Sequence, residues 1–234
     1  GSMANTLSAE EFREYVRPLL GLEVSLAWRG YGSAIFLELG RLSPPQGSRA
    51  VHENGEACFM IEWDWRIESR SSVLFGSSNS GPEIEAGIRG LHGSRINEIS
   101  AVGRVPELIV VFSNRQLLRS MMTLSGDPQW GIRLPSGSWL SARHGALWLD
   151  AQPEGNTDAE EAAWTLSETT RDRWGIPSAE PVGGRCEDCT WYLRVDGEGH
   201  VRDYGVCSAW DSPFDGRVVN KSSGCPVYRP ADAL

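Results

Sequence analysis

Two similar stretches decide the fold of this chain, LLGLEVSLAWRGYGSAIFLELG at residues 19–40 and LHGSRINEISAVGRVPELIVVFS at residues 91–113. Each begins with Leu-x-Gly and has a β-branched residue three positions after the glycine. Each ends in alternating apolar residues, the period of two that half-buried strands require. A Trp-x-Ile motif follows in each half, at residues 65–67 and 130–132. Four shared features in the same order predict a duplicated β unit.

One such unit buries only one face and needs a partner, so we expect the two copies to share a core. The fold class is therefore α+β and mostly β, with a duplicated antiparallel β unit at residues 19–150 that forms a sandwich or split barrel. Residues 1–18 should supply an N-terminal helix, because Ser8 and Glu11 form a capping-box pattern.

Two further elements are expected inside the β-rich region. Residues 56–65 alternate so that one side carries Phe59, Ile61, Trp63 and Trp65, which predicts one continuous half-buried strand. Apolar residues at helical spacing predict a short helix within residues 81–93.

The composition changes after residue 150. Residues 151–180 contain seven acidic and two basic side chains, and they predict an acidic linker followed by a helix capped by Thr157 or Asp158. Residues 181–234 form a separate module that is rich in Gly, Asp, Ser and Arg. Because its few apolar residues cannot form a stable hydrophobic core by themselves, this module needs a covalent or metal cross-link, which we call the staple.

Four cysteines in this module supply the staple: Cys186, Cys189, Cys207 and Cys225, in the pattern C-x2-C-x17-C-x17-C. The fifth, Cys58, lies far away in the sequence and is expected to be a small buried apolar residue. A reducing compartment and an odd number of cysteines favour metal-bound thiolates over disulfides. We therefore predict a metal site made by the four C-terminal cysteines.

The identity of the metal stays open. Zinc suits four thiolates, but zinc ribbons usually present two C-x2-C pairs, and here only Cys186 and Cys189 form one. One pair followed by two single cysteines resembles high-potential iron-sulfur proteins and small cluster-bearing subunits of some glycyl-radical enzymes. That resemblance implies a [4Fe-4S] cluster shielded by aromatic residues, for which the candidates are Trp191, Tyr192, Tyr204, Trp210, Phe214 and Tyr228. His200 is a further candidate ligand.

Charge and hydropathy limit the partners. The net charge of −9 discourages nonspecific nucleic-acid binding and favours a protein partner with a basic surface. The apolar runs have about the length of strands, far short of the ~20 residues that a membrane-spanning helix needs. With no secretory signal, we expect a cytoplasmic protein. Most of the ten tryptophans should be core, with Trp28 or Trp139 as exposed interface anchors.

Two regions resemble known families. The block GVCSAWDSPFDGRVVNKSSGC at residues 205–225 is similar to an uncharacterised actinobacterial family that has GVC, SPxDGRVV and GC at matching spacing. The β unit, through Leu-x-Gly-x-x-Ile and the segment at residues 106–113 followed by Trp130, weakly resembles immunity proteins that accompany polymorphic toxins. This second resemblance implies a bacterial protein that binds and blocks a toxin.

No nucleotide-binding loop, nucleophile elbow or zinc-protease motif is present in the sequence, so we do not expect an enzyme. The sequence predicts a protein-binding protein with a structural zinc module, and toxin neutralisation is the role that the resemblance suggests. An iron-sulfur redox or electron-transfer protein is the alternative. A zinc module that binds nucleic acid is a third hypothesis, which the charge disfavours.

Overall fold

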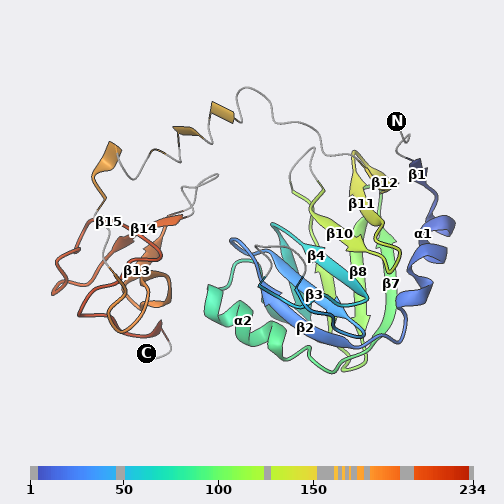
Figure 1. Ribbon diagram of the computed structural model, residues 1–234, viewed down its shortest axis with the longest axis horizontal. Helices are drawn as coiled ribbons and strands as arrows, with labels where there is room; N and C mark the ends of the chain where they lie inside the picture. The colour runs from blue at the N-terminus through green and yellow to red at the C-terminus, as the bar shows by residue number, and fades with distance from the viewer. Residues whose placement is uncertain are drawn as a thin grey trace. The chain divides into compact units, whose positions relative to one another are not determined.

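The computed structural model describes residues 5–45, 51–123, 128–151, 161–162, 165–166, 169, 173–176, 180–195 and 203–231. The chain divides into two compact units, Gly1–Glu154 and Gly155–Leu234 (Figure 1). Within the described residues, the first unit contains two antiparallel sheets with two α-helices, and the second contains a sheet of three short strands.

The first unit has helices α1 (Ala9–Val16) and α2 (Gly81–Arg89) and a short 3-10 turn, η1 (Arg17–Leu19). Its strands are β1 (Asn5–Leu7), β2 (Val24–Arg29), β3 (Ile35–Leu39), β4 (Ala57–Ile61), β5 (Trp65–Glu68), β6 (Val73–Gly76), β7 (Ile96–Val102), β8 (Glu107–Phe112), β9 (Leu117–Ser120), β10 (Trp130–Arg133), β11 (Trp139–Arg143) and β12 (Ala146–Leu149). They form a seven-stranded sheet in the order β1-β12-β11-β10-β4-β3-β2 and a five-stranded sheet in the order β6-β5-β9-β8-β7.

Each half of this unit crosses from one sheet to the other. The first half places β2, β3 and β4 in the seven-stranded sheet and then β5 and β6 in the five-stranded sheet. The second half does the reverse, with β7, β8 and β9 in the five-stranded sheet and β10, β11 and β12 in the seven-stranded sheet. At the crossings β4 pairs with β10, and β5 pairs with β9. Two facing copies of one unit account for this reciprocal topology.

The two Leu-x-Gly segments pair with each other. The N–H of Gly21 donates to the carbonyl of Ile96 at 2.8 Å, and the N–H of Gly93 donates to the carbonyl of Val24 at 3.0 Å. Both glycines have a positive φ, 82° and 81°, which glycine adopts without steric cost. The matching donors, acceptors and dihedral angles show that the repeated motif is also repeated in structure.

The two helices repeat as well. Ser8 begins α1 and Ser80 begins α2, and each forms a capping box with the glutamate three residues later, Glu11 or Glu83. In both caps the hydrogen bond from the serine backbone N–H lowers the pKa of the glutamate below its ordinary value. α1 contacts β7 of the second half, and α2 contacts β2 of the first half (Figure 1). Each helix thus packs on the other copy's first strand.

Because the two caps are equivalent, Ser8→Ala and Ser80→Ala should destabilise the first unit by similar amounts. Each substitution removes the side-chain acceptor of an N-terminal N–H, which costs about 1 kcal/mol. Urea unfolding of the full chain, followed by the fluorescence of its buried tryptophans, measures this loss. Ser71→Ala, at an exposed turn, is the matched control and should change little. A loss confined to one of the two caps would contradict the equivalence.

The two Trp-x-Ile motifs occupy equivalent places at the sheet crossings. Trp65 begins β5, and its indole N–H donates to the carbonyl of Ser33, just before β3, at 2.8 Å. Trp130 begins β10, and its indole N–H donates to the carbonyl of Pro106, just before β8, at 2.9 Å. Both rings are fully buried. Each tryptophan therefore ties a crossing strand to the hairpin of its own half.

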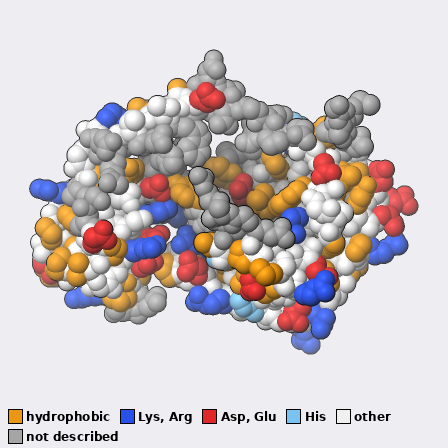
Figure 2. Space-filling view, in the orientation of Figure 1, with side chains coloured by type: hydrophobic (Ala, Val, Ile, Leu, Met, Phe, Trp, Pro, Cys, Tyr) orange, Lys and Arg blue, Asp and Glu red, His pale blue; other side chains and the backbone are white. Residues whose placement is uncertain are grey.

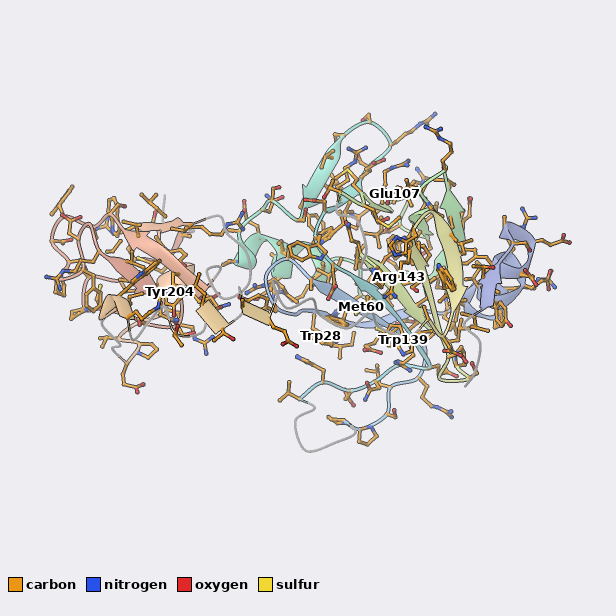
Figure 3. All side chains as sticks on the ribbon, turned by 90° about the horizontal axis from the view of Figure 1, so that it is seen from above. Trp28, Met60, Glu107, Trp139, Arg143 and Tyr204 are labelled. Carbon is orange, nitrogen blue, oxygen red and sulfur yellow. The ribbon has the colours of Figure 1, made fainter. Side chains whose placement is uncertain are left out.

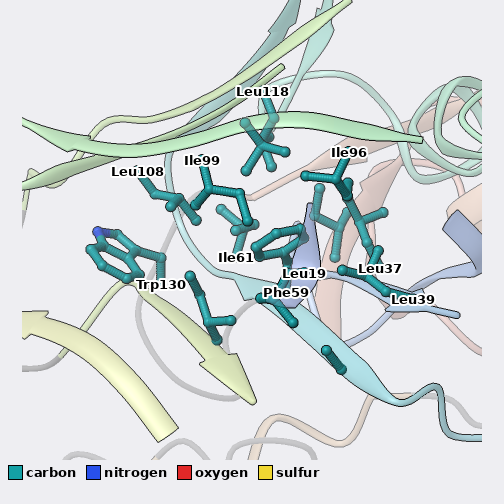
Figure 4. Close-up of a cluster of buried hydrophobic side chains, with 14 of the residues drawn as sticks. Leu19, Leu37, Leu39, Phe59, Ile61, Ile96, Ile99, Leu108, Leu118 and Trp130 are labelled. Carbon is teal, nitrogen blue, oxygen red and sulfur yellow. The ribbon is translucent and has the colours of Figure 1, made fainter. Parts of the chain in front are cut away.

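A single hydrophobic cluster lies between the sheets of the first unit (Figure 4). Both sheets contribute to it, with Leu37, Phe59 and Ile61 from the seven-stranded sheet and Leu108 and Leu118 from the five-stranded sheet. The strand orders leave both sheets open among the described residues. The structure thus confirms an α+β protein that is mostly β, in the sandwich form.

The prediction of one continuous strand over residues 56–65 is wrong. β4 ends at Ile61 and β5 begins at Trp65 in the other sheet. Between them Trp63 has φ 58°, a left-handed conformation that interrupts a strand and is rare for a bulky residue. The alternating pattern continues through the break because both strands present apolar residues to the same core.

The tryptophans expected as exposed anchors, Trp28 and Trp139, are only half-exposed. Trp28 is stacked on Phe36, with ring centroids 3.9 Å apart, and on His52, with centroids 4.2 Å apart. Trp28, Met60 and Trp139 share one face of the seven-stranded sheet according to its register (Figure 3). The rings of Phe36 and His52 therefore cover much of the Trp28 surface that was expected to be available to a partner.

On the face shown in Figure 2, basic and acidic side chains are interspersed, with apolar side chains between them. Among the described helices, none has both the length and the apolar composition needed to cross a membrane.

Candidate metal centre

The second unit is built on three short strands, β13 (Tyr192–Arg194), β14 (Tyr204–Cys207) and β15 (Val218–Asn220), with β14 in the centre. Figure 3 labels Tyr204, which begins the central strand. A 3-10 turn, η2 (Cys186–Asp188), precedes the sheet. Within the linker helix expected before this module, the described residues 161–162, 165–166 and 173–174 are helical, whereas Thr157 and Asp158 lie outside the described residues.

The C-x2-C pair lies on η2 and the residue after it. The N–H of Cys189 donates to the carbonyl of Cys186 at 2.9 Å, which closes the turn and places both side chains on one short loop. The N–H of Cys186 donates to the carbonyl of Ser223 at 2.6 Å, two residues before the fourth cysteine. The backbone thus brings the first and last cysteine segments together.

Cys207 ends the central strand. It pairs with Tyr192 of β13 in the sheet register, its N–H donates to the carbonyl of Arg217 at 3.1 Å, and the N–H of Gly216 donates to its carbonyl at 2.9 Å. These bonds fix the backbone of Cys207 on two sides. The loop at residues 208–216 is closed at its base by the same contacts.

Cys225 follows Gly224, a position where the neighbouring backbone leaves no room for a side chain. A Cβ atom on Gly224 would come within 2.5 Å of the carbonyl oxygen of Gly184 and 2.8 Å of the Cα of Pro181, so a larger residue would push these segments apart. The Ser212 hydroxyl contacts the Cys225 sulfur at 3.5 Å, with the geometry of a donated hydrogen bond. Ser212 is itself buried.

The four cysteines interact electrostatically. Burial, and then the nearby thiols of Cys225, Cys207 and Cys189, raise the pKa of Cys186 to about 12. Cys186, Cys207 and Cys225 are buried, Cys189 is half-buried, and none of the four forms a disulfide. Three chain segments distant in sequence therefore bring their thiols into one neighbourhood around Cys186.

The sulfurs are nevertheless not arranged as a finished coordination site. Among the residues that the structure describes, no three or more His, Cys, Asp or Glu side chains form a group that could hold a metal ion as they stand. The four thiols as a donor set fit a soft divalent metal.

The hydrophobic cluster of this unit is small. Its buried members are Cys186, Cys207, Ala209 and Val219, and half-buried Trp191, Tyr192, Phe214 and Val227 pack against them. Two of its four buried residues are candidate ligands, so the apolar core and the candidate metal centre are the same place. Burial, and then the nearby carboxylate of Glu187, raise the pKa of the Tyr192 hydroxyl above its ordinary value.

The expectations for Cys58, Trp210 and His200 can each be compared with the structure. Cys58 lies apart from the others on β4 of the first unit, where burial and then nearby Glu38 raise the pKa of its thiol. Trp210, expected among the aromatic shields, is 80% exposed and does not belong to the cluster. His200 lies outside the described residues.

Sequence reasoning missed two residues that support the centre. The contact of Ser212 with Cys225 joins residues 13 positions apart in the sequence. The ammonium of Lys221 forms an ion pair with the carboxylate of Asp203 at 2.8 Å, while the backbone N–H of Lys221 donates to the carbonyl of Asp203 at 2.7 Å. One feature of the sequence marks Lys221, because it is the only lysine in a chain with 21 arginines.

Comparison with known proteins gives one match. Residues 151–229 match the model of a family described as "Protein of unknown function (DUF3027)". The match begins just before the boundary of the second unit and includes all four of its cysteines. No curated protein and no solved structure matches the chain. The second unit is thus similar to a recurring domain.

Proposed function

We propose that one Zn²⁺ held by Cys186, Cys189, Cys207 and Cys225 stabilises the second unit, and that the protein acts by binding another protein. The observation that carries the zinc proposal is the set of thiols around Cys186. They come from separate segments and coincide with the small core of a unit that has little other apolar packing. A metal ion at this place would connect every part of the module at once.

Four cysteine sulfurs match the closed tetrahedral ligand sets of structural zinc sites, which leave no position for a substrate. Binding requires the thiols to lose their protons and the sulfurs to move together to Zn–S distances of about 2.3 Å. The Ser212 hydroxyl is placed to donate a hydrogen bond to the Cys225 thiolate, and such outer contacts orient metal ligands. The metal therefore supplies folding energy, and binding of a partner takes place elsewhere on the protein.

The protein-binding part of the proposal has separate support. A net charge of −9 favours a partner with a basic surface and speeds the encounter with it. The β unit's resemblance to immunity proteins makes neutralisation of a basic toxin the form of binding that we propose to test. Co-purification with the product of a neighbouring gene, together with protection against its toxicity, is the expected result. Failure of both would count against this role.

Metal analysis with an absorption spectrum, on protein purified without oxygen, tests the identity of the metal. The zinc proposal predicts a colourless protein that contains one zinc per chain. A second candidate, a [4Fe-4S] cluster with a redox role, is favoured by the aromatic side chains of Trp191, Tyr192 and Phe214 against the cysteine cluster. It predicts a brown protein whose visible absorption bleaches on reduction. That outcome would replace zinc by iron at the same four cysteines.

A further inference from the structure

Trp210 is the most exposed aromatic side chain among the described residues, at 80%. It lies on the loop between β14 and β15, three residues after Cys207. Tryptophan is enriched among the residues that contribute most to the energy of protein interfaces. Trp210 is therefore a candidate anchor for a binding partner.

The loop that presents Trp210 is anchored on both sides. Both the N–H and the hydroxyl of Ser208 donate to the carbonyl of Trp191 at 2.9 Å. The N–H of Ser212 donates to the carbonyl of Ala209 at 2.9 Å, and both of these residues are buried. A side chain on such a held backbone loses little entropy when a partner covers it.

The loop that carries Trp210 also carries two acidic side chains. Asp211 follows it directly, and Asp215 closes the same loop by bridging to Cys207. Both are exposed, and neither forms an ion pair with another described residue. A cation placed at Trp210 would have two carboxylates from the same short loop available to it.

The protein already shows the complementary contact within itself. The guanidinium of Arg229 lies over the ring of Trp191, 5.7 Å from its centroid, and the Trp191 and Trp210 rings are 6.0 Å apart. Cations are attracted to the faces of indole rings by the ring quadrupole. Arg229 thus covers the ring of Trp191, whereas no cation among the described residues lies over the ring of Trp210.

We propose that Trp210, Asp211 and Asp215 form a docking site for an arginine- or lysine-bearing segment of a partner protein. The basic side chain lies over the indole of Trp210, and its charge is balanced by the two carboxylates. This inference rests on the proposed protein-binding function and adds where the basic partner binds. Negative charge at the site also disfavours the phosphate backbone of a nucleic acid.

The probe is a Gly-Arg repeat peptide, with a Gly-citrulline peptide of the same length as its uncharged counterpart. Binding to the full-length protein is measured by calorimetry and by the NMR signals of the indole N–H groups. We expect the arginine peptide to bind and to shift the Trp210 signal, and the citrulline peptide to bind at least about tenfold more weakly. Trp210→Ala should weaken binding about tenfold, and Asp211→Asn with Asp215→Asn should weaken it further at low salt.

Trp174→Ala is the matched control, because Trp174 is another exposed tryptophan of the same unit, at 54%, and it should leave peptide binding unchanged. Equal affinity of wild type and Trp210→Ala, or equal affinity for the two peptides, would overturn the docking site. So would binding of a single-stranded oligonucleotide at Trp210 with none of the peptide. Zinc content is measured on the same samples, so a metal-free protein counts against the zinc proposal alone.

Discussion

Replacing Cys207 with serine should remove the metal from the protein and unfold residues 181–231, while the first unit stays folded. Cys207 ends the central strand of the small sheet and is one of the few buried residues of its core. Structural zinc supplies about 10–16 kcal/mol of apparent binding energy, more than the whole stability of most small domains. A chelator added to the wild-type protein should have the same effect.

Amide NMR of the full chain measures this loss, because it reports the two units separately. Cys58→Ala is the matched control. Cys58 is buried on β4 of the first unit, whereas the other cysteines belong to the second unit, so this variant should keep its metal and the signals of the second unit. Persistence of a folded second unit in Cys207→Ser, with unchanged chemical shifts outside the substituted loop, would show that the module does not depend on metal.

Replacing Trp130 with alanine should destabilise the first unit by about 3–5 kcal/mol. The ring is fully buried between the sheets, packs edge-on against Phe12 with centroids 6.1 Å apart, and donates its indole N–H to the carbonyl of Pro106. The substitution opens a large cavity and leaves that carbonyl without its partner. Trp65→Ala should cost a similar amount, because Trp65 makes the equivalent bond to Ser33.

Urea unfolding of the full chain, followed by the circular dichroism of the first unit, compares the two variants. Leu20→Ala, at an exposed apolar residue of the same unit, should change the unfolding free energy by less than about 0.5 kcal/mol. If either tryptophan variant lost only about 1 kcal/mol of unfolding free energy, the two tryptophans would not contribute equally to the stability of the first unit.

The elements that local sequence determines were predictable. The capping boxes at Ser8 and Ser80 use residues three positions apart, and the second helix follows apolar residues at helical spacing. The duplication could be recognised in the sequence because each half contains a Leu-x-Gly and a Trp-x-Ile motif. These motifs are needed at equivalent positions in the two halves of the fold. Patterns of this kind depend on neighbours in the chain, so the sequence alone contains them.

Features that depend on distant contacts were not predictable. The break between β4 and β5 needs the left-handed Trp63, and nothing in its neighbours requires that conformation. The carboxylate of Glu38, which is 3% exposed, binds Arg133 at 2.9 Å across 95 positions and also accepts the N–H of Gly55 at 2.8 Å. Only the assembled sheet brings these groups together.

The candidate metal centre could be predicted from the sequence only in part. Cysteine spacing identified the four thiols as one set, because four cysteine thiolates are a common ligand set for structural zinc. Spacing could not place Ser212 beside Cys225, nor could it separate Trp210 from the aromatic residues that pack on the cluster. Both features depend on the path of the loop between β14 and β15, which the strand pairing and the buried Ala209 fix.

Native mass spectrometry of the intact protein tests the central claim most directly, because it counts metal ions on each folded chain. We predict one zinc ion per chain in the wild type and in Cys58→Ala, and none in Cys207→Ser. A wild-type chain that is compact in both units and carries no metal, with all five cysteines present as free thiols, would contradict the account.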